Sequence, residues 1–156
     1  MIVEKDYLDF LQLLNQHHVE YLVIGGYAMI AYNEPRYTKD LDIWVKAEKT
    51  NAEKMIRVID EFGFASLEIN KEDFLSSRTF IQLGVAPVRI DLTSDISGVT
   101  FDEAFKNQEL ARIGGIEVPV IGIHELIKNK LISGRKQDIA DAETLSKILK
   151  LKKGGK

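Results

Sequence analysis

A short apolar run that ends in two glycines constrains the fold of this chain most strongly. Residues 21–24 (Tyr-Leu-Val-Ile) have the length and composition of a buried strand, and residues 27–32 have a helical pattern. Gly25 and Gly26 lie between them, and glycine permits the backbone conformations that a tight turn needs. The pattern predicts a strand, a glycine turn and a helix. A Gly-Gly pair between a strand and a helix most often serves only to form a turn. At the start of a helix, however, it also lets backbone N–H groups approach an anion closely.

Apolar periodicity assigns elements to the rest of the chain, because helical spacing predicts helices and alternation predicts strands. The predicted helices cover residues 4–17, 27–32, 50–62, 101–105, 123–133 and 137–150. The predicted strands cover residues 21–24, 41–45, 79–83, 88–92, 110–113 and 116–118. This order predicts an α/β or α+β domain with a mixed sheet.

Length and composition limit the class of protein. The 156 residues fit a single domain, 1–156, and 45% apolar residues exclude a disordered chain. The absence of cysteine excludes disulfides and thiolate metal sites. No apolar run reaches the roughly 18–20 residues that span a bilayer, and the N-terminus has no basic stretch followed by an apolar one. We therefore expect a soluble, cytoplasmic protein that does not enter a membrane.

Charge is distributed unevenly along the chain. The net charge is −3, and residues 126–156 hold nine Lys/Arg and three Asp/Glu, or +6, which leaves −9 on residues 1–125. One interpretation is that the basic helical end, about 123–150, attracts an anionic substrate. The favoured alternative is a solvated lysine run at the negative end of a helix dipole, comprising Lys147, Lys150, Lys152, Lys153 and Lys156. The net negative charge argues against general binding of duplex nucleic acid.

Three aspartates carry the chemistry that the sequence suggests. Asp40 and Asp42 are two residues apart and share one face of a predicted strand, and Asp91 lies in the middle of another strand whose other face is apolar. If the two strands are neighbours, the three carboxylates converge at one edge of the sheet. Hard oxygen ligands of this kind hold Mg²⁺, and paired metal ions support displacement at phosphorus. The acids therefore predict phosphate chemistry.

The order of these motifs resembles the nucleotidyltransferase superfamily that includes DNA polymerase β. Its pattern is a hydrophobic residue before Gly-Gly or Gly-Ser, a spacer, a hydrophobic-flanked Asp-x-Asp/Glu, and a later Asp between hydrophobic residues. The matching segments here are Ile24-Gly25-Gly26, thirteen intervening residues, Asp40-Leu41-Asp42-Ile43 and Ile90-Asp91-Leu92.

The chain is most similar to small aminoglycoside-type and abortive-infection-type nucleotidyltransferases. Residues 36–42 (Arg-Tyr-Thr-Lys-Asp-Leu-Asp) match their Arg-x-Thr/Ser-x-Asp-x-Asp segment. A later helical tail is matched by Lys130, Arg135 and Asp138-Ile139-Ala140-Asp141. The resemblance covers about residues 20–145.

The resemblance implies a nucleotidyltransferase-like fold, a mixed, mostly antiparallel twisted sheet of about five strands flanked by helices. It also implies a metal-dependent enzyme that moves a nucleoside monophosphate from a nucleoside triphosphate to an acceptor hydroxyl and releases pyrophosphate. By this likeness Asp40 and Asp42 would bind both Mg²⁺ or Mn²⁺ ions, and Asp91 would complete one site and lower the pKa of the attacking hydroxyl. The implied nucleotide-binding residues are Gly25, Gly26, Arg36, Thr38 and Lys130.

Several of these residues have structural alternatives. Arg36 is either a phosphate ligand or a loop arginine paired with Glu34 or with the Asp40/Asp42 pair. Thr38 either contacts the nucleotide or only hydrogen-bonds within its own loop. For Lys130 a contact with the triphosphate is favoured, and the structural alternative for Arg135 is to cap a helix end. For Asp138 and Asp141, pairing with Lys or Arg or capping of the last helix is favoured. The aromatic residues beside the motifs suit base stacking or, more often, the core: Tyr27, Tyr32, Tyr37 and Trp44.

Other site chemistries lack their motifs, and one other class of function competes. The three histidines have no metal-ligand spacing, and there is no nucleophilic-serine or P-loop motif. The competing function is a catalytically inactive nucleotide-fold module, binding or antitoxin-like, that acts with a separate helical partner protein. It stays open because the extra helical domain with which many transferases hold their acceptor is missing, but the three carboxylates favour an enzyme. The acceptor is open between a small molecule, tRNA and a protein.

Overall fold

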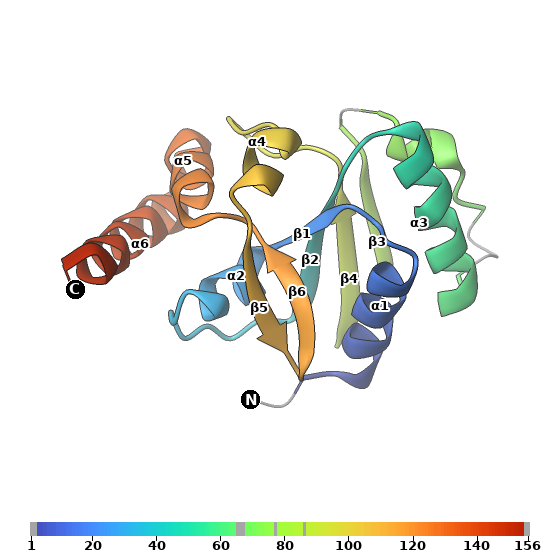
Figure 1. Ribbon diagram of the computed structural model, residues 1–156, viewed down its shortest axis with the longest axis horizontal. Coiled ribbons are helices and arrows are strands. Elements are labelled where there is room, and N and C mark those ends of the chain that lie inside the picture. Colours follow the sequence, from blue (N-terminus) through green and yellow to red (C-terminus); the bar gives the residue numbers. More distant parts are fainter. Residues whose placement is uncertain (1–2, 65–67, 77, 86, 155–156) are drawn as a thin grey trace.

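The strands form one mixed sheet in the order β3-β4-β2-β1-β6-β5 (Figure 1). The computed structural model describes residues 3–64, 68–76, 78–85 and 87–154. Strand bounds are β1 Tyr21–Ile24, β2 Asp40–Val45, β3 Phe80–Val85, β4 Val88–Thr93, β5 Glu109–Ile113 and β6 Ile116–Val120. The pairs β1–β2, β3–β4 and β5–β6 are antiparallel, and β2–β4 and β1–β6 are parallel. The mixed, mostly antiparallel sheet is confirmed, with six strands rather than about five because the β5–β6 hairpin joins β1.

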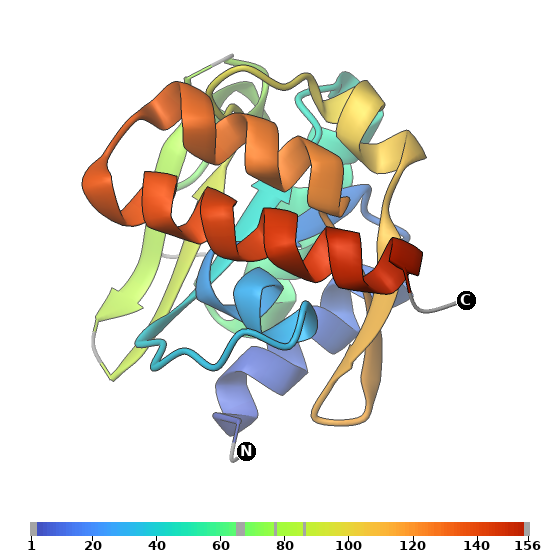
Figure 2. The same ribbon diagram turned by 90° about the vertical axis from the view of Figure 1, so that its left-hand side faces the viewer.

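Helices cover both sides of the sheet. The helix bounds are α1 Lys5–Gln16, α2 Gly25–Ala31, α3 Lys49–Phe62, α4 Phe101–Lys106, α5 Ile123–Ser133 and α6 Lys136–Gly154. α1 and α3 lie side by side against one face, and α5 and α6 lie side by side on the opposite side of the molecule (Figures 1 and 2). The apolar stripe of α1, spaced three and four residues apart, is buried: Tyr7, Phe10, Leu11 and Leu14.

β2 has two chemically different faces, as the alternation of its sequence requires. Leu41, Ile43 and Val45 are buried in the core. On the other face, Trp44 is buried against the edge of Phe101 in α4, with the two ring centroids 5.2 Å apart. The polar residues of β2 therefore lie on the face of the sheet that points away from α1 and α3.

The start of α2 differs from the expectation of a turn followed by a helix. Gly25 and Gly26 are themselves the first two residues of α2, directly after the extended residue Ile24. Gly25 has a φ of +69°, a conformation that side-chain-bearing residues rarely adopt, so the chain reverses from strand to helix at one residue. This sharp junction places the first turn of α2 beside the strand that carries the aspartates.

Two further differences from the predicted elements lie outside the site. A 3₁₀ helix, η2 (Lys71–Phe74), occupies a stretch for which no element was predicted. α6 continues to Gly154, beyond the predicted end at residue 150, and Lys156 lies outside the described residues. Within the described ranges, no helix combines the length and the apolar character that crossing a membrane requires.

Candidate active site

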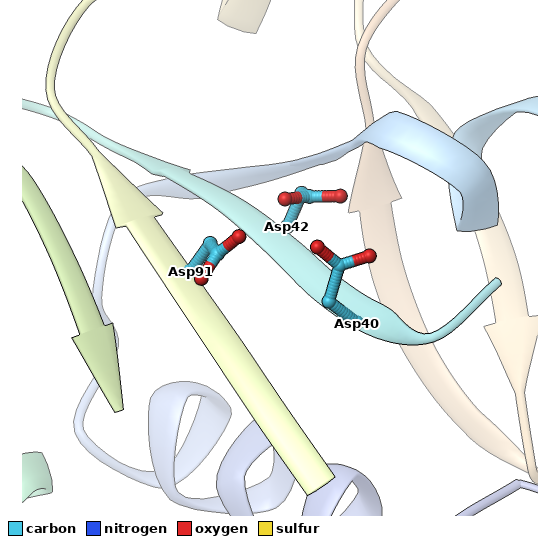
Figure 3. Close-up of side chains that lie close together, drawn as sticks. All are labelled: Asp40, Asp42 and Asp91. Atoms are coloured by element: carbon cyan, nitrogen blue, oxygen red, sulfur yellow. The ribbon is translucent and has the colours of Figure 1, made fainter. Parts of the chain in front are cut away.

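The structure brings the carboxylates of Asp40, Asp42 and Asp91 together on one side of the sheet (Figure 3). β2 and β4 are parallel neighbours, and their register sets Asp42 opposite Asp91 and Asp40 opposite Arg89. One oxygen from each carboxylate lies within 4.8 Å of the corresponding oxygens of the other two. Asp91 is buried, and the other two are half-buried. The predicted strand neighbours therefore produce a compact three-carboxylate cluster.

The cluster is electrostatically strained without a cation. Burial, together with the negative charges of Asp40 and Asp91, raises the pKa of Asp42 to about 7. Burial and a hydrogen bond with Asp91 raise the pKa of Asp40 as well. Carboxyl groups that resist ionisation at neutral pH need a positive charge nearby before all of them can be anionic. The donor set fits a hard divalent cation such as Mg²⁺, which prefers carboxylate oxygens and lowers such pKa values.

Arg89 is the one cationic partner that the described residues place directly on this cluster. Its Nε donates to Asp91 Oδ1 at 2.9 Å and its Nη2 donates to Asp91 Oδ2 at 2.8 Å. The alternation of β4 puts Arg89 and Asp91 on one face, but no motif in the sequence indicates a function for Arg89. This bidentate pair fixes the orientation of the Asp91 carboxylate.

The glycines at the start of α2 lie against the cluster and its loop. A Cβ atom added to Gly25 would lie 2.2 Å from Asp42 Oδ2, and one added to Gly26 would lie 2.8 Å from the Thr38 side chain. Thr38 itself donates a hydrogen bond from Oγ1 to the carbonyl of Asp40 at 2.8 Å. Thr38 thus bonds within its own loop, as one of its two interpretations held, and the glycines allow the first turn of α2 to approach Asp42.

Asp141 of α6 pairs with both cations that the sequence analysis named as nucleotide ligands. Arg36 donates from Nη1 and Nη2 to its two oxygens at 3.0 and 2.6 Å, and Lys130 Nζ donates to Oδ2 at 2.8 Å. Gln137 adds a third donor at 2.9 Å. Burial favours the neutral acid, but these hydrogen bonds outweigh it and lower the pKa of Asp141 to about 2. Asp141 is only 3% exposed, so this is a buried ionic junction between the loop, α5 and α6.

The partner of Arg36 corrects one structural alternative. The alternative paired Arg36 with Glu34 or with the Asp40/Asp42 pair, whereas its carboxylate partner is Asp141, 105 positions later. Such a pairing depends on how α6 packs, which no local pattern reveals.

Asp138 extends the ionic junction toward the end of α5. It accepts hydrogen bonds from Lys130 at 3.5 Å, from Arg135 at 3.0 Å, and from Ser133. The pairing with Lys or Arg that was favoured for Asp138 is present, and Arg135 is one of its partners. Three cations and two carboxylates leave this junction with one net positive charge.

A cleft connects the carboxylates with these cations. A cavity of about 440 Å³ is lined by both glycines, Asp40 and Arg89, and by four residues of the ionic junction, Arg36, Lys130, Asp138 and Asp141. A second cavity, of about 380 Å³, shares Gly25 and Lys130 with the first and reaches Asp42. The cleft therefore runs from Asp40 and Asp42 of the three-carboxylate cluster, past the first turn of α2, to α5 and α6. Its polar walls combine carboxylates with the cations of the ionic junction.

The family comparison agrees with this arrangement. Residues 3–155 match a family described as "Nucleotidyl transferase of unknown function (DUF2204)". The chain belongs to this nucleotidyl transferase family. No curated protein matches the chain.

Two solved structures show the fold to which this chain is similar. It superposes on TM1012 of Thermotoga maritima, assigned as a nucleotidyltransferase, with a TM-score of 0.60 and 19% identity over 96% of each chain. It also superposes on the lincosamide antibiotic adenylyltransferase LnuA in its lincomycin-bound form, with a TM-score of 0.53 and 15% identity over 94% of this chain and 98% of LnuA. At these identities the likeness shows the nucleotidyltransferase-like fold, which the sequence analysis predicted.

The aromatic residues near the motifs of the nucleotidyl transferase divide into two groups. Tyr27, Tyr32 and Trp44 are buried and belong to the core. Tyr37 is 85% exposed and lines the cleft beside Asp40. Of these four aromatic residues, Tyr37 alone has an exposed ring at the site.

Proposed function

We propose that this protein is a metal-dependent nucleotidyltransferase that moves a nucleoside monophosphate from a nucleoside triphosphate to an acceptor hydroxyl and releases pyrophosphate. The convergence of Asp40, Asp42 and Asp91 on one side of the sheet carries the proposal. In the proposed site these three carboxylates hold Mg²⁺ or Mn²⁺. The bound ions supply charge neutralisation at the phosphates and an acidified acceptor hydroxyl.

The protein's own groups bind and orient the triphosphate in this proposal. The N–H groups of the first turn of α2, at Gly25 and Gly26, have no partners within the helix and suit phosphate oxygens. Arg36 and Lys130 supply positive charge at the leaving pyrophosphate. Pairing with Asp141 does not use all of their hydrogen-bond donors, because a guanidinium has five N–H donors and an ammonium has three. Asp141 therefore holds both cations in place while donors remain for phosphate.

Asp91 and Arg89 define the acceptor side of the proposed reaction. In-line displacement puts the attacking hydroxyl opposite the leaving pyrophosphate. Because α2 and the ionic junction take the pyrophosphate, the hydroxyl approaches from the β4 side, where Asp91 lies. There Asp91 would complete a metal site that lowers the pKa of the hydroxyl, whose proton passes to solvent as the hydroxyl oxygen attacks the α-phosphorus. The pair with Arg89 keeps the Asp91 carboxylate oriented.

A small-molecule hydroxyl, a tRNA end and a protein side chain all satisfy this chemistry as acceptors. The structural neighbour LnuA is a lincosamide antibiotic adenylyltransferase. A small-molecule acceptor is therefore the first class to screen.

A thermal-shift panel tests the proposal. Wild type, the Asp40→Asn/Asp42→Asn double variant and a control double variant, Asp9→Asn/Asp60→Asn, are melted with ATP, GTP, CTP or UTP, with and without Mg²⁺ or Mn²⁺. The control acids lie on α1 and α3, on the other side of the sheet. A ligand that binds only the folded state raises the melting temperature. We expect a metal-dependent rise in wild type and control with at least one triphosphate, and none in the Asp40→Asn/Asp42→Asn protein.

The opposite result points to the competing function. If no triphosphate shifts wild type in any metal, a stand-alone nucleotidyltransferase is excluded. The competing hypothesis, an inactive nucleotide-fold module that works with a separate helical partner protein, then becomes the one to pursue.

A further inference from the structure

Tyr37 is an exposed aromatic residue at the edge of the proposed catalytic cleft. Its side chain is 85% exposed, the largest exposed fraction among the large hydrophobic residues of the described chain. It lies in the loop between α2 and β2, three positions before Asp40, and no hydrogen bond holds its hydroxyl among the described residues. A ring so exposed beside a polar cleft gains nothing from packing in the free protein.

Tyr37 also borders another cavity, distinct from the two that form the cleft, to which the proposed function assigns no ligand. This tyrosine pocket has a volume of about 500 Å³ and is lined by Glu4, Tyr7, Tyr27, Tyr37, Thr38, Lys39 and Pro87. Residues 37–39 line both the tyrosine pocket and the cleft that contains Asp40. The tyrosine pocket therefore adjoins the cleft at this loop, and its volume lies within the range of small-molecule sites.

The inner wall of the tyrosine pocket is tied to the strands that carry the carboxylates. The Tyr7 hydroxyl donates to the Lys39 carbonyl at 3.1 Å and accepts from the Arg89 backbone N–H at 3.2 Å. The rings of Tyr7 and Tyr27 meet edge to face, with centroids 6.1 Å apart. The wall is thus fixed relative to Asp40 and Asp91, as a binding site for part of the same substrate requires.

The opposite flank of the cleft offers no comparable surface. The cavity that reaches Asp42 is lined there by Ile96, Ser97, Leu126 and Asn129, with no aromatic side chain among its lining residues. A planar heterocycle gains most from stacking on an exposed aromatic ring. With the triphosphate directed toward α2 and the ionic junction, the nucleoside extends from the carboxylates to one flank or the other.

We propose that Tyr37 stacks on the base of the nucleoside triphosphate and that the tyrosine pocket receives this base. The inference rests on the proposed function, because it requires a triphosphate held at the carboxylates. It adds the part of the protein that recognises the nucleoside rather than the phosphates.

Comparing a nucleotide with its phosphate chain alone tests the assignment. Titration calorimetry measures the Kd of ATP and of inorganic tripolyphosphate, each with Mg²⁺, for wild type, Tyr37→Ala and Tyr37→Phe. Loss of stacking is expected to weaken ATP binding by Tyr37→Ala about 5- to 10-fold, because base–aromatic stacking contributes appreciably per base. Tripolyphosphate has no base, so its Kd should not change. Tyr37→Phe keeps the ring and should bind ATP like wild type.

The controls separate this inference from the proposed function. Leu110→Ala removes another exposed apolar side chain, 64% exposed, on β5 at the far edge of the sheet, and should bind both ligands like wild type. Unchanged ATP binding by Tyr37→Ala overturns the base site while leaving the proposed function intact. An equal weakening for ATP and tripolyphosphate also overturns it, since Tyr37 would then act on the phosphates. If wild type binds neither ligand, the proposed function fails and the base site fails with it.

Discussion

Asp42 lies directly over Gly25, so closely that a methyl group at position 25 would come within 2.2 Å of Asp42 Oδ2. Gly25 also has a φ of +69°, which favours glycine independently of the contact. One residue therefore meets two requirements, the turn from β1 into α2 and the space for a carboxylate of the cluster. The glycine pair of the sequence and its Asp-x-Asp segment form a single structural unit.

Substituting Gly25→Ala should damage both stability and the site. The left-handed conformation costs an alanine about 1–2 kcal/mol, and the contact with the half-buried carboxylate of Asp42 adds to that cost. We expect a loss of more than about 2 kcal/mol in the free energy of unfolding, measured in urea, and loss of metal-dependent nucleotide binding. Gly115→Ala is the matched control, since Gly115 has a φ of +85° but no atom within 4 Å of an added Cβ. Gly115→Ala should lose only the stability that the left-handed conformation costs an alanine, and it should keep nucleotide binding. Equal losses of unfolding free energy in Gly25→Ala and Gly115→Ala would contradict the contact with Asp42.

Removing the charge of Asp42 should stabilise the metal-free protein at alkaline pH. Burial and the neighbouring carboxylates raise the pKa of Asp42 from 3.8 to about 7, so the folded state holds a proton that the unfolded state releases. The stability contributed by this proton is complete below about pH 4 and is lost as the pH rises through about 7. With a chelator present to remove metal, the free energy of unfolding of Asp42→Asn should exceed that of wild type by on the order of 2 kcal/mol at pH 8 and by much less at pH 5. Urea unfolding at the two pH values measures this, and an unchanged difference between them would argue against a strained cluster.

The ionic junction should contribute substantially to stability. Asp141→Asn leaves Arg36 and Lys130 without their buried counter-charge, and breaking such pairs typically costs about 3–5 kcal/mol. Because the pKa of Asp141 is lowered to about 2, its contribution is present above about pH 4 and is lost as the pH falls through 2. Glu143→Gln is the control on the same helix, since its pair with Lys147 is exposed and should be worth under about 0.5 kcal/mol. Chemical unfolding at neutral pH should show a much larger loss of unfolding free energy for Asp141→Asn than for Glu143→Gln. Comparable losses in the two variants would show that the ionic junction does not stabilise the fold.

The Tyr7 hydroxyl should matter for the site as well as for the fold. Tyr7→Phe removes the hydrogen bonds to the Lys39 carbonyl and the Arg89 N–H, at a cost of about 1–2 kcal/mol, and loosens the ends of β2 and β4. Tyr32→Phe is the matched control, because its buried hydroxyl donates to the Ile121 carbonyl at 2.7 Å. Both variants should lose similar stability in urea, but only Tyr7→Phe should weaken metal-dependent nucleotide binding. Equal nucleotide binding by the two variants would limit Tyr7 to a packing function.

Local patterns predicted much of the sheet and the carboxylate cluster. β1 and β2 have short apolar or alternating runs, and Asp91 stands out because the other face of its strand is apolar. Those patterns depend on neighbouring residues alone. The convergence of Asp91 with Asp40 and Asp42 followed from the assumption that the two strands are adjacent, whereas the register that sets Asp42 opposite Asp91 is given by the structure.

The electrostatic partners of the site were not predictable in the same way. Arg36 and Asp141 are 105 positions apart, and their pairing depends on the packing of α6 against the loop before β2. The bidentate bond from Arg89 to Asp91 had a local signal, since alternation puts both on one face, but a sequence does not distinguish such a pair from two solvated charges. Long-range ion pairs follow from tertiary packing, which local patterns do not encode.

Calorimetric titration of Mn²⁺ into the nucleotide-free protein tests the central claim most directly. That claim is that Asp40, Asp42 and Asp91 together hold the metal that a nucleoside triphosphate requires. Wild type and Asp9→Asn/Asp60→Asn should bind Mn²⁺ at least about tenfold more tightly than Asp40→Asn/Asp42→Asn, since carboxylate ligands dominate such sites. Equal Mn²⁺ affinity in all three proteins would contradict the claim.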